Sequence, residues 1–167
     1  MWVLELKFQD YTKRGSEARC AAQSSFLCDW FMAVQSRLSR IIISELTENQ
    51  VIYLKEMDGD REFPILIGIF EATNIDRRVN EGFQTPRPLT HDLIVSVAEA
   101  FGAKVDHVVI SHYESGTYYA KLMLKHAGGQ WSEIDARPSD AIAVAVTFNP
   151  PLPIFVEEDV FEASSSK

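Results

Sequence analysis

The first half of the chain alternates apolar and polar residues with the two-residue period of β-strands. A β-branched run marks a buried strand at Leu38–Glu45, and further strands are predicted at Val51–Leu54 and Phe63–Ile67. Asp58-Gly59-Asp60 lies between the second and third of these strands and is typical of a hairpin turn. We therefore predict a three-stranded antiparallel meander in this part of the chain.

The second half repeats this alternation in shorter strands. Strands are predicted at residues 105–111, 117–126 and 131–135, and glycine-containing turns separate them. A last short strand is predicted at residues 154–156. The acidic stretch that follows, Glu157–Glu162, is expected to fray or to form a surface turn of helix.

Three stretches instead repeat apolar residues with helical spacing, at residues 68–82, 90–101 and 138–148. The third is apolar over almost its whole length, which predicts a central, buried helix. The inner stripe predicted for the first helix consists of Ala72, Ile75 and Val79.

The second helix is expected to begin with Thr90 as its cap and to carry Asp92 in its first turn, where negative charge is favoured. Its predicted inner face consists of Leu93, Val97 and Ala100, and its polar face of Asp92, Ser96 and Glu99.

The predicted elements follow the order βββ-αα-βββ-α-β. Hairpins outnumber helices, so the fold class is α+β, with a mixed, mostly antiparallel sheet and three main helices. Regular patterning begins near Met32. We therefore expect one domain over residues 32–161, a peripheral or disordered segment over residues 1–31 and a disordered tail over residues 162–167. Met32 is then a candidate initiator.

Charge restricts the classes of partner. The formal net charge is −8. Residues 1–31 carry equal numbers of acidic and basic residues, so the whole excess lies in residues 32–167. This charge argues against a broad basic face that binds nucleic acid, but it allows phosphates to bind at a small arginine-lined site or through a metal.

Other sequence features point to a cytoplasmic protein without a structural metal or disulfide framework. No apolar run is long enough to span a bilayer, and charged residues interrupt the N-terminal apolar stretch. Cys20 and Cys28 have no further cysteine partners, which argues against a disulfide framework and against a four-cysteine zinc site.

Two proline-braced segments concentrate the polar chemistry. Thr85–Leu93 and Asp135–Asp140 each bring an Arg-Pro pair, a hydroxyl and a carboxylate to the start of a largely apolar helix. Prolines restrict the backbone before each helix. We therefore expect the two segments to meet and to form one polar site.

The second segment has two interpretations. Asp135 ends a strand and Asp140 begins a helix predicted to be buried, so each carboxylate needs a partner or a metal ion. Arg137 is the obvious partner. A purely structural network, in which Asp140 caps the helix and Arg137 ties the cap to the strand end, explains the pattern slightly better from sequence alone.

The first segment is also ambiguous. Arg87 lies between two prolines, which suits recognition of a phosphate or carboxylate. A salt bridge to Asp135, Asp140 or Glu71 is the alternative. His91 titrates near neutrality and is a candidate acid or base, although a surface histidine at a helix start and a dipole-compensating Asp92 are the simpler interpretations.

From about Val34 to Val160 the chain resembles the bifunctional nuclease domain family. Several long motifs in the same order make the resemblance specific. They are Ser39–Glu45, Phe63–Ala72, Arg77-Arg78, Pro86–Leu93 and Asp135–Ile142.

The resemblance implies a nuclease that hydrolyses phosphodiester bonds of DNA and RNA, and a homo-oligomer is possible. It carries no secure catalytic assignment, so roles follow from chemistry as a hypothesis. The catalytic candidates are His91, Asp92, Asp135 and Asp140; the substrate-binding candidates are Arg87, Arg137 and Arg78; and the candidate ligands of a divalent cation, Mg or Mn, are Asp135, Asp140 and Glu71.

Two other classes remain open. A non-catalytic binding or regulatory module would use the same arginines to hold a phosphate or carboxylate ligand. A structural subunit of an oligomer would use the charged residues only for folding.

Overall fold

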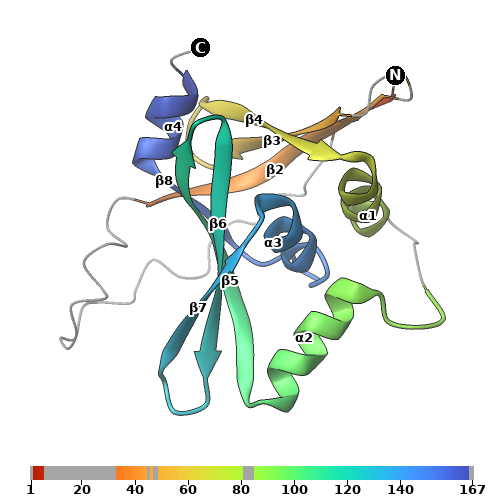
Figure 1. Cartoon of the computed structure of the whole chain (residues 1–167), viewed down its shortest axis with the longest axis vertical. Helices are drawn as coiled ribbons and strands as arrows, with labels where there is room; N and C mark the ends of the chain where they lie inside the picture. Colours follow the sequence, from red (N-terminus) through yellow and green to blue (C-terminus); the bar gives the residue numbers. More distant parts are fainter. Residues whose placement is uncertain (1, 6–32, 45, 47–48, 81–84, 166–167) are drawn as a thin grey trace.

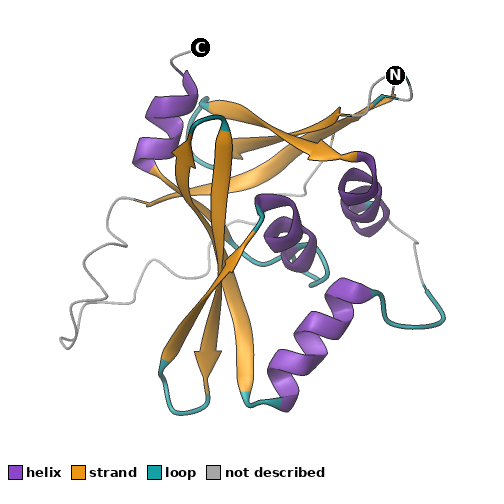
Figure 2. Cartoon of the chain, in the orientation of Figure 1, coloured by secondary structure: helices purple, strands orange, loops and turns teal. Residues whose placement is uncertain are grey.

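A computed structural model describes residues 2–5, 33–44, 46, 49–80 and 85–165 of the chain. Its elements, coloured along the chain in Figure 1 and by type in Figure 2, are β1 (Trp2–Glu5), β2 (Ala33–Ile43), β3 (Asn49–Glu56), β4 (Glu62–Gly68), α1 (Ile69–Val79), α2 (Thr90–Ala100), β5 (Ala103–Glu114), β6 (Thr117–His126), β7 (Trp131–Ala136), α3 (Pro138–Ala145), β8 (Ile154–Glu157) and α4 (Glu158–Ser165).

The strands form one mixed sheet in the order β4-β3-β2-β8-β5-β6-β7. The two predicted sets of hairpins make its two halves, and β8 joins them. It pairs antiparallel with β2 and parallel with β5, while the other pairs are antiparallel. β1 lies off this path and pairs with the far end of β2. The predicted α+β class and mostly antiparallel sheet are therefore confirmed.

Helices α1, α2 and α3 lie on one side of the twisted sheet (Figure 1). α3 is the central one: from Pro138 to Ala145 every residue except Asp140 is buried, as the unbroken apolar pattern predicted. Ala72 and Ile75 of α1 are fully buried and Val79 packs against the core, which confirms the predicted stripe.

The prediction for α2 was wrong in two respects. Leu89, not Thr90, is the N-cap residue, and the Asp92 carboxylate accepts a hydrogen bond from the Leu89 N–H at 2.7 Å. The predicted inner residues Leu93 and Val97 are 57% and 48% exposed. The side chains that pack against the core are instead those of Val95 and Ala98.

The C-terminal stretch is also more ordered than predicted. α4 is a helix that continues through Ser165, and both Val160 and Phe161 are 1% exposed. Arg61, beside the β3–β4 turn, binds Glu158 at the start of α4 and Glu56. These contacts fix a fourth helix against the sheet, where the sequence predicted either fraying or a surface turn of helix.

The segment predicted to be peripheral, residues 1–31, lies outside the described residues apart from β1. None of the described helices is both long enough and apolar enough to cross a membrane.

Candidate functional site

A cavity of about 260 Å³ lies where α1 meets the first turns of α2 and α3. Its polar lining combines both proline-braced segments with one face of α1. The residues that supply it are Glu71, Asn74, Thr90, His91, Arg137, Ser139 and Asp140. The expectation that the two segments meet is therefore confirmed for the described part of the chain.

Arg137 is the central cation of this cavity. It is the N-cap residue of α3, and its extended backbone, followed by Pro138, directs the side chain outward. Its Nε and Nη2 donate to the two carboxylate oxygens of Asp140 at 2.8 and 3.1 Å, and its Nη1 donates to Glu71 at 3.1 Å. The side chain is nevertheless 67% exposed.

These bonds do not use the whole guanidinium group. A guanidinium carries five N–H donors, and three are engaged here. Two N–H donors of Arg137 therefore have no partner among the described residues. Because two carboxylates restrain the group, it is held ready for a further anionic oxygen atom.

Glu71 reaches Arg137 because Gly68 leaves room for it. Gly68 ends β4, and a Cβ atom at that position would lie 2.4 Å from the Glu71 Oε2 atom. The backbone φ of Gly68 is −77°, so the backbone conformation does not require glycine. The glycine is needed here for space beside the carboxylate.

His91 lies in the first turn of α2 and is half-buried. Burial lowers its pKa below the ordinary value of 6.5; attraction to Asp140 opposes this change, while Arg78 adds to it. The imidazole is therefore mainly neutral at pH 7 and is able to accept a proton.

Asp92 and Arg78 form an ion pair that joins α2 to α1. Burial raises the pKa of Asp92, but the hydrogen bonds from Arg78 and from the Leu89 N–H outweigh it and hold the pKa below its usual value. Neither side chain lines the cavity. The structure therefore places both residues at the junction of two helices, a role that the sequence did not suggest for either of them.

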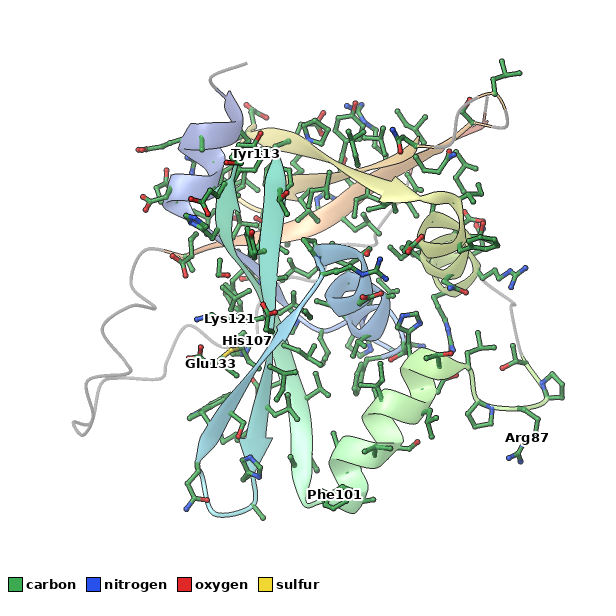
Figure 3. All side chains as sticks on the ribbon, in the orientation of Figure 1. Arg87, Phe101, His107, Tyr113, Lys121 and Glu133 are labelled. Carbon is green, nitrogen blue, oxygen red and sulfur yellow. The ribbon has the colours of Figure 1, made fainter. Side chains whose placement is uncertain are left out.

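Two expected members of the site lie elsewhere. Asp135 is exposed on β7. It follows the strand alternation onto the face of Glu133, while Ala136 packs on the core side with α3. Glu133 binds Lys121, and both lie on the side of the sheet away from α3 in Figure 3.

Arg87 is exposed in the loop before α2, and its side chain points away from the molecule in Figure 3. The described residues offer it no hydrogen bond or ion pair. The expected salt bridge from Arg87 to Asp135, Asp140 or Glu71 is therefore not formed there. The two proline-braced segments carry five of the expected site residues besides Asp92, namely Arg87, His91, Asp135, Arg137 and Asp140. The cavity brings together His91, Arg137 and Asp140.

Comparison with known proteins identifies the family. The family model of the bifunctional nuclease domain matches residues 51–167, which include all the residues that line the cavity. The chain belongs to the bifunctional nuclease domain family. The match begins within β3 and runs to the end of the chain, so this bifunctional nuclease domain contains the helices α1 to α4.

The domain also resembles two relatives from strains of Mycobacterium tuberculosis, the uncharacterized proteins MT1877 and Rv1829. Each is 41% identical over 117 residues, which cover 70% of this chain and 67% of the relative. Likeness at this level over the matched region supports a shared fold around the cavity.

The carboxylates of this bifunctional nuclease domain do not fit the metal site expected from the sequence. Of the proposed ligands, Glu71 and Asp140 lie on either side of Arg137 and bind it, while Asp135 lies on the other face of the sheet. No group of three or more His, Cys, Asp or Glu side chains in the described part of the chain is arranged to hold a metal ion. Within the described residues, Glu71 and Asp140 serve instead as partners of Arg137.

Three polar residues of the cavity were not among the site residues expected from the sequence. Asn74 follows Glu71 by three positions on α1, and this helical spacing places both on one face. Ser139 and Thr90 were visible only as hydroxyls within the two motifs. The spacing from Glu71 to Asn74 is the signal in the sequence that could have identified Asn74.

Proposed function

We propose that this protein hydrolyses phosphodiester bonds of DNA and RNA at the cavity between α1, α2 and α3. One observation carries the proposal: Arg137, restrained by Glu71 and Asp140, keeps two N–H donors unengaged within the described residues, at a cavity that His91 also lines. Membership of the bifunctional nuclease domain family supports the reaction class.

In the proposed mechanism Arg137 holds the non-bridging oxygen atoms of the scissile phosphate. Its unengaged N–H groups stabilise the negative charge that develops on them as water attacks phosphorus. The neutral imidazole of His91 takes the proton of that water, and the bond from phosphorus to the leaving oxygen breaks. The leaving oxygen then receives a proton, either from the imidazolium or from water.

Asp140 has two roles in this scheme. It anchors Arg137 through two hydrogen bonds. Its negative charge also raises the pKa of His91 and so stabilises the imidazolium that forms during attack. Glu71 acts only through Arg137 and is therefore a positioning residue.

The experiment measures cleavage of labelled single-stranded DNA and RNA by the full chain. We expect His91→Gln and Arg137→Gln each to lower kcat/KM by about a hundredfold or more. The matched control is Arg87→Gln, an exposed arginine that does not line the cavity. We expect Arg87→Gln to cleave as fast as the parent protein, and the proposal fails if both cavity variants do so as well.

Cation dependence is a separate proposal, and the same assay addresses it. Cleavage is measured in EDTA and with added Mg²⁺ or Mn²⁺, on the parent protein and on Asp135→Asn. We expect Asp135→Asn to match the parent protein under every condition, because Asp135 lies on the opposite face of the sheet. If Asp135→Asn selectively lost metal-stimulated cleavage, that result would support the metal site of Asp135, Asp140 and Glu71 that the sequence suggested.

A second candidate is a binding module without catalysis. The observation that favours it is that the Arg137 guanidinium faces two carboxylates, so that its positive charge is already compensated by protein side chains. This class predicts no cleavage under any condition, together with ligand binding that Arg137→Gln abolishes.

A further inference from the structure

A second and larger hollow adjoins the cavity. This groove has a volume of about 700 Å³ and extends from the start of α3 along β4 to the β5–β6 turn. Glu71, Arg137 and Ser139 line both the cavity and the groove. A ligand anchored on Arg137 therefore has room to continue into the groove.

The groove has a different chemical character from the cavity. Among the described residues that line the groove, only Glu71 and Arg137 are charged, and both lie at the boundary that it shares with the cavity. Its wall along β4 includes Leu66, which is 66% exposed, and Pro64. Its far end includes Tyr113 and Tyr118, whose ring centroids are 4.5 Å apart.

Such a lining does not suit a run of phosphates, because each further phosphate needs a cation or several hydrogen-bond donors. It suits a flat, uncharged group with an apolar face. In a nucleic acid strand that group is the base of the nucleotide next to the phosphate, and bases bind proteins through contact with apolar and aromatic side chains.

We propose that the groove receives an unpaired base adjacent to the phosphate held by Arg137, so that the substrate class of this site is single-stranded nucleic acid. This inference rests on the proposed function, since it takes the phosphate position from Arg137. In a duplex the base faces are stacked and the pairing edges are used, so a base enters the groove only after leaving the stack.

The test compares two probes with equal numbers of phosphates. One is a fluorescent oligothymidylate, and the other is an oligomer of the same length made of abasic spacers. Anisotropy titrations use the full chain carrying His91→Gln to suppress cleavage, and gels confirm that the probes stay intact. A duplex of the same length is the third probe.

We expect the oligothymidylate to bind about tenfold more tightly than the abasic oligomer and the duplex. Leu66→Ser should reduce that ratio towards one while leaving the affinity for the abasic oligomer unchanged. The matched control is Ile134→Ser, an exposed apolar residue on β7 outside both hollows. Because both side chains are exposed, both variants should fold, and circular dichroism melts verify this.

The outcomes separate this inference from the proposed function. Equal binding of base-bearing, abasic and duplex probes, with cleavage intact in the parent protein, overturns the groove assignment and leaves hydrolysis standing. A different result is that the parent protein binds bases in a way that Leu66→Ser removes and yet cleaves no probe. That result overturns the proposed hydrolytic function and supports the assignment of the groove to a base. The groove assignment is also overturned if Leu66→Ser leaves the ratio of the affinities for oligothymidylate and abasic oligomer unchanged.

Discussion

Single residues of the site differ in how far the sequence could reveal them. Arg137 and Asp140 are three positions apart across a helix start, so their pairing followed from local spacing. The bond from Arg137 to Glu71 joins residues 66 positions apart. Sequence named Glu71 as a candidate third carboxylate, but its contact depends on how α1 and α3 pack, which no local pattern encodes.

Gly68 offers a test of positioning that is separate from stability. The Cβ of Gly68→Ala would lie 2.4 Å from Glu71 Oε2, and a flexible carboxylate is able to move away at little cost. We expect the free energy of unfolding to change by less than about 1 kcal/mol, while kcat/KM falls because Arg137 loses one of its anchors.

The matched control is Gly128→Ala, whose Cβ would meet the end of the Gln130 side chain at 2.9 Å in the β6–β7 turn, where neither residue lines the cavity. Denaturant unfolding and cleavage kinetics are measured on both variants. An equal loss of activity in the two would contradict a role for Gly68 in placing Glu71.

His91 predicts the pH dependence of cleavage. Its pKa lies below 6.5, so the neutral, proton-accepting form prevails above that pH and is lost as the pH falls through the lowered pKa. The acidic limb of the profile of kcat/KM should therefore have a midpoint below 6.5. Asp140→Asn removes a charge that raises this pKa, so the midpoint should move to still lower pH.

The profile is measured on single-stranded DNA at constant ionic strength, with Asp135→Asn as the control because Asp135 lies away from the cavity. The acidic limb of the kcat/KM profile would have to come from the titration of another group if its midpoint lay above pH 6.5. The same would follow if Asp140→Asn moved the midpoint to higher pH.

Among the elements, α2 shows where periodicity misleads. Its apolar residues recur with helical spacing, so the sequence predicted Leu93 and Val97 as its inner face. The structure turns that stripe outward: Asp92 pairs with Arg78 on α1, and Val95 and Ala98 face the core. The rotation of α2 is thus tied to contacts with other elements, and such contacts are not visible in one helix alone.

This rotation makes opposite predictions for neighbouring valines. Val95→Ala should lower the free energy of unfolding by about 1 kcal/mol or more, because it removes packed methyl groups. Val97→Ala should change it by less than about 0.5 kcal/mol, because Val97 is largely exposed. Urea denaturation of both variants measures these changes. A larger loss of stability for Val97→Ala than for Val95→Ala would mean that Val97, not Val95, packs against the core.

The ion pair itself predicts a pH-dependent contribution to stability. Asp92 and Arg78 are only 26% and 18% exposed, so Asp92→Asn should cost about 1–3 kcal/mol at pH 7. The pKa of Asp92 is lowered on folding, so its contribution is present above the unfolded value of 3.8 and is lost as the pH falls through the folded value.

Unfolding is therefore compared for the parent protein and Asp92→Asn at pH 7 and at progressively lower pH. The difference between them should shrink in acid. A difference that stays constant down to pH 3 would mean that packing, not the charge of Asp92, joins the two helices.

At the scale of the whole molecule, hairpins were predictable and long-range pairing was not. The order from β2 to β8 matches the predicted βββ-αα-βββ-α-β, because turns and alternation are local signals. The parallel pairing of β8 with β5 and the docking of α4 depend on contacts between distant parts of the chain.

The exposed stripe of α2 bears on assembly, which the sequence raised only as a possibility. Leu93, Ile94, Val97 and Phe101 are each between 39% and 83% exposed, and they lie on successive turns. We expect concentration-dependent self-association through this stripe, since a helix with one apolar face is able to pair with a second copy of itself.

Sedimentation velocity over a range of concentrations tests this on the full chain. The double variant Val97→Ser with Phe101→Ser should sediment as the smaller species at concentrations where the parent protein associates. A parent protein that remains monomeric throughout would remove the homo-oligomer from consideration.

The aromatic rings behind the groove have a consequence for biosynthesis. Phe161 of α4 packs edge-on against Phe63 at 5.1 Å, and Phe63 stacks at 5.4 Å on Tyr118. A nascent chain that has emerged from the ribosome only as far as β8 holds every residue of the small cavity, yet it lacks the ring that supports this stack. The lining of the cavity is therefore complete earlier in translation than the aromatic support of the groove.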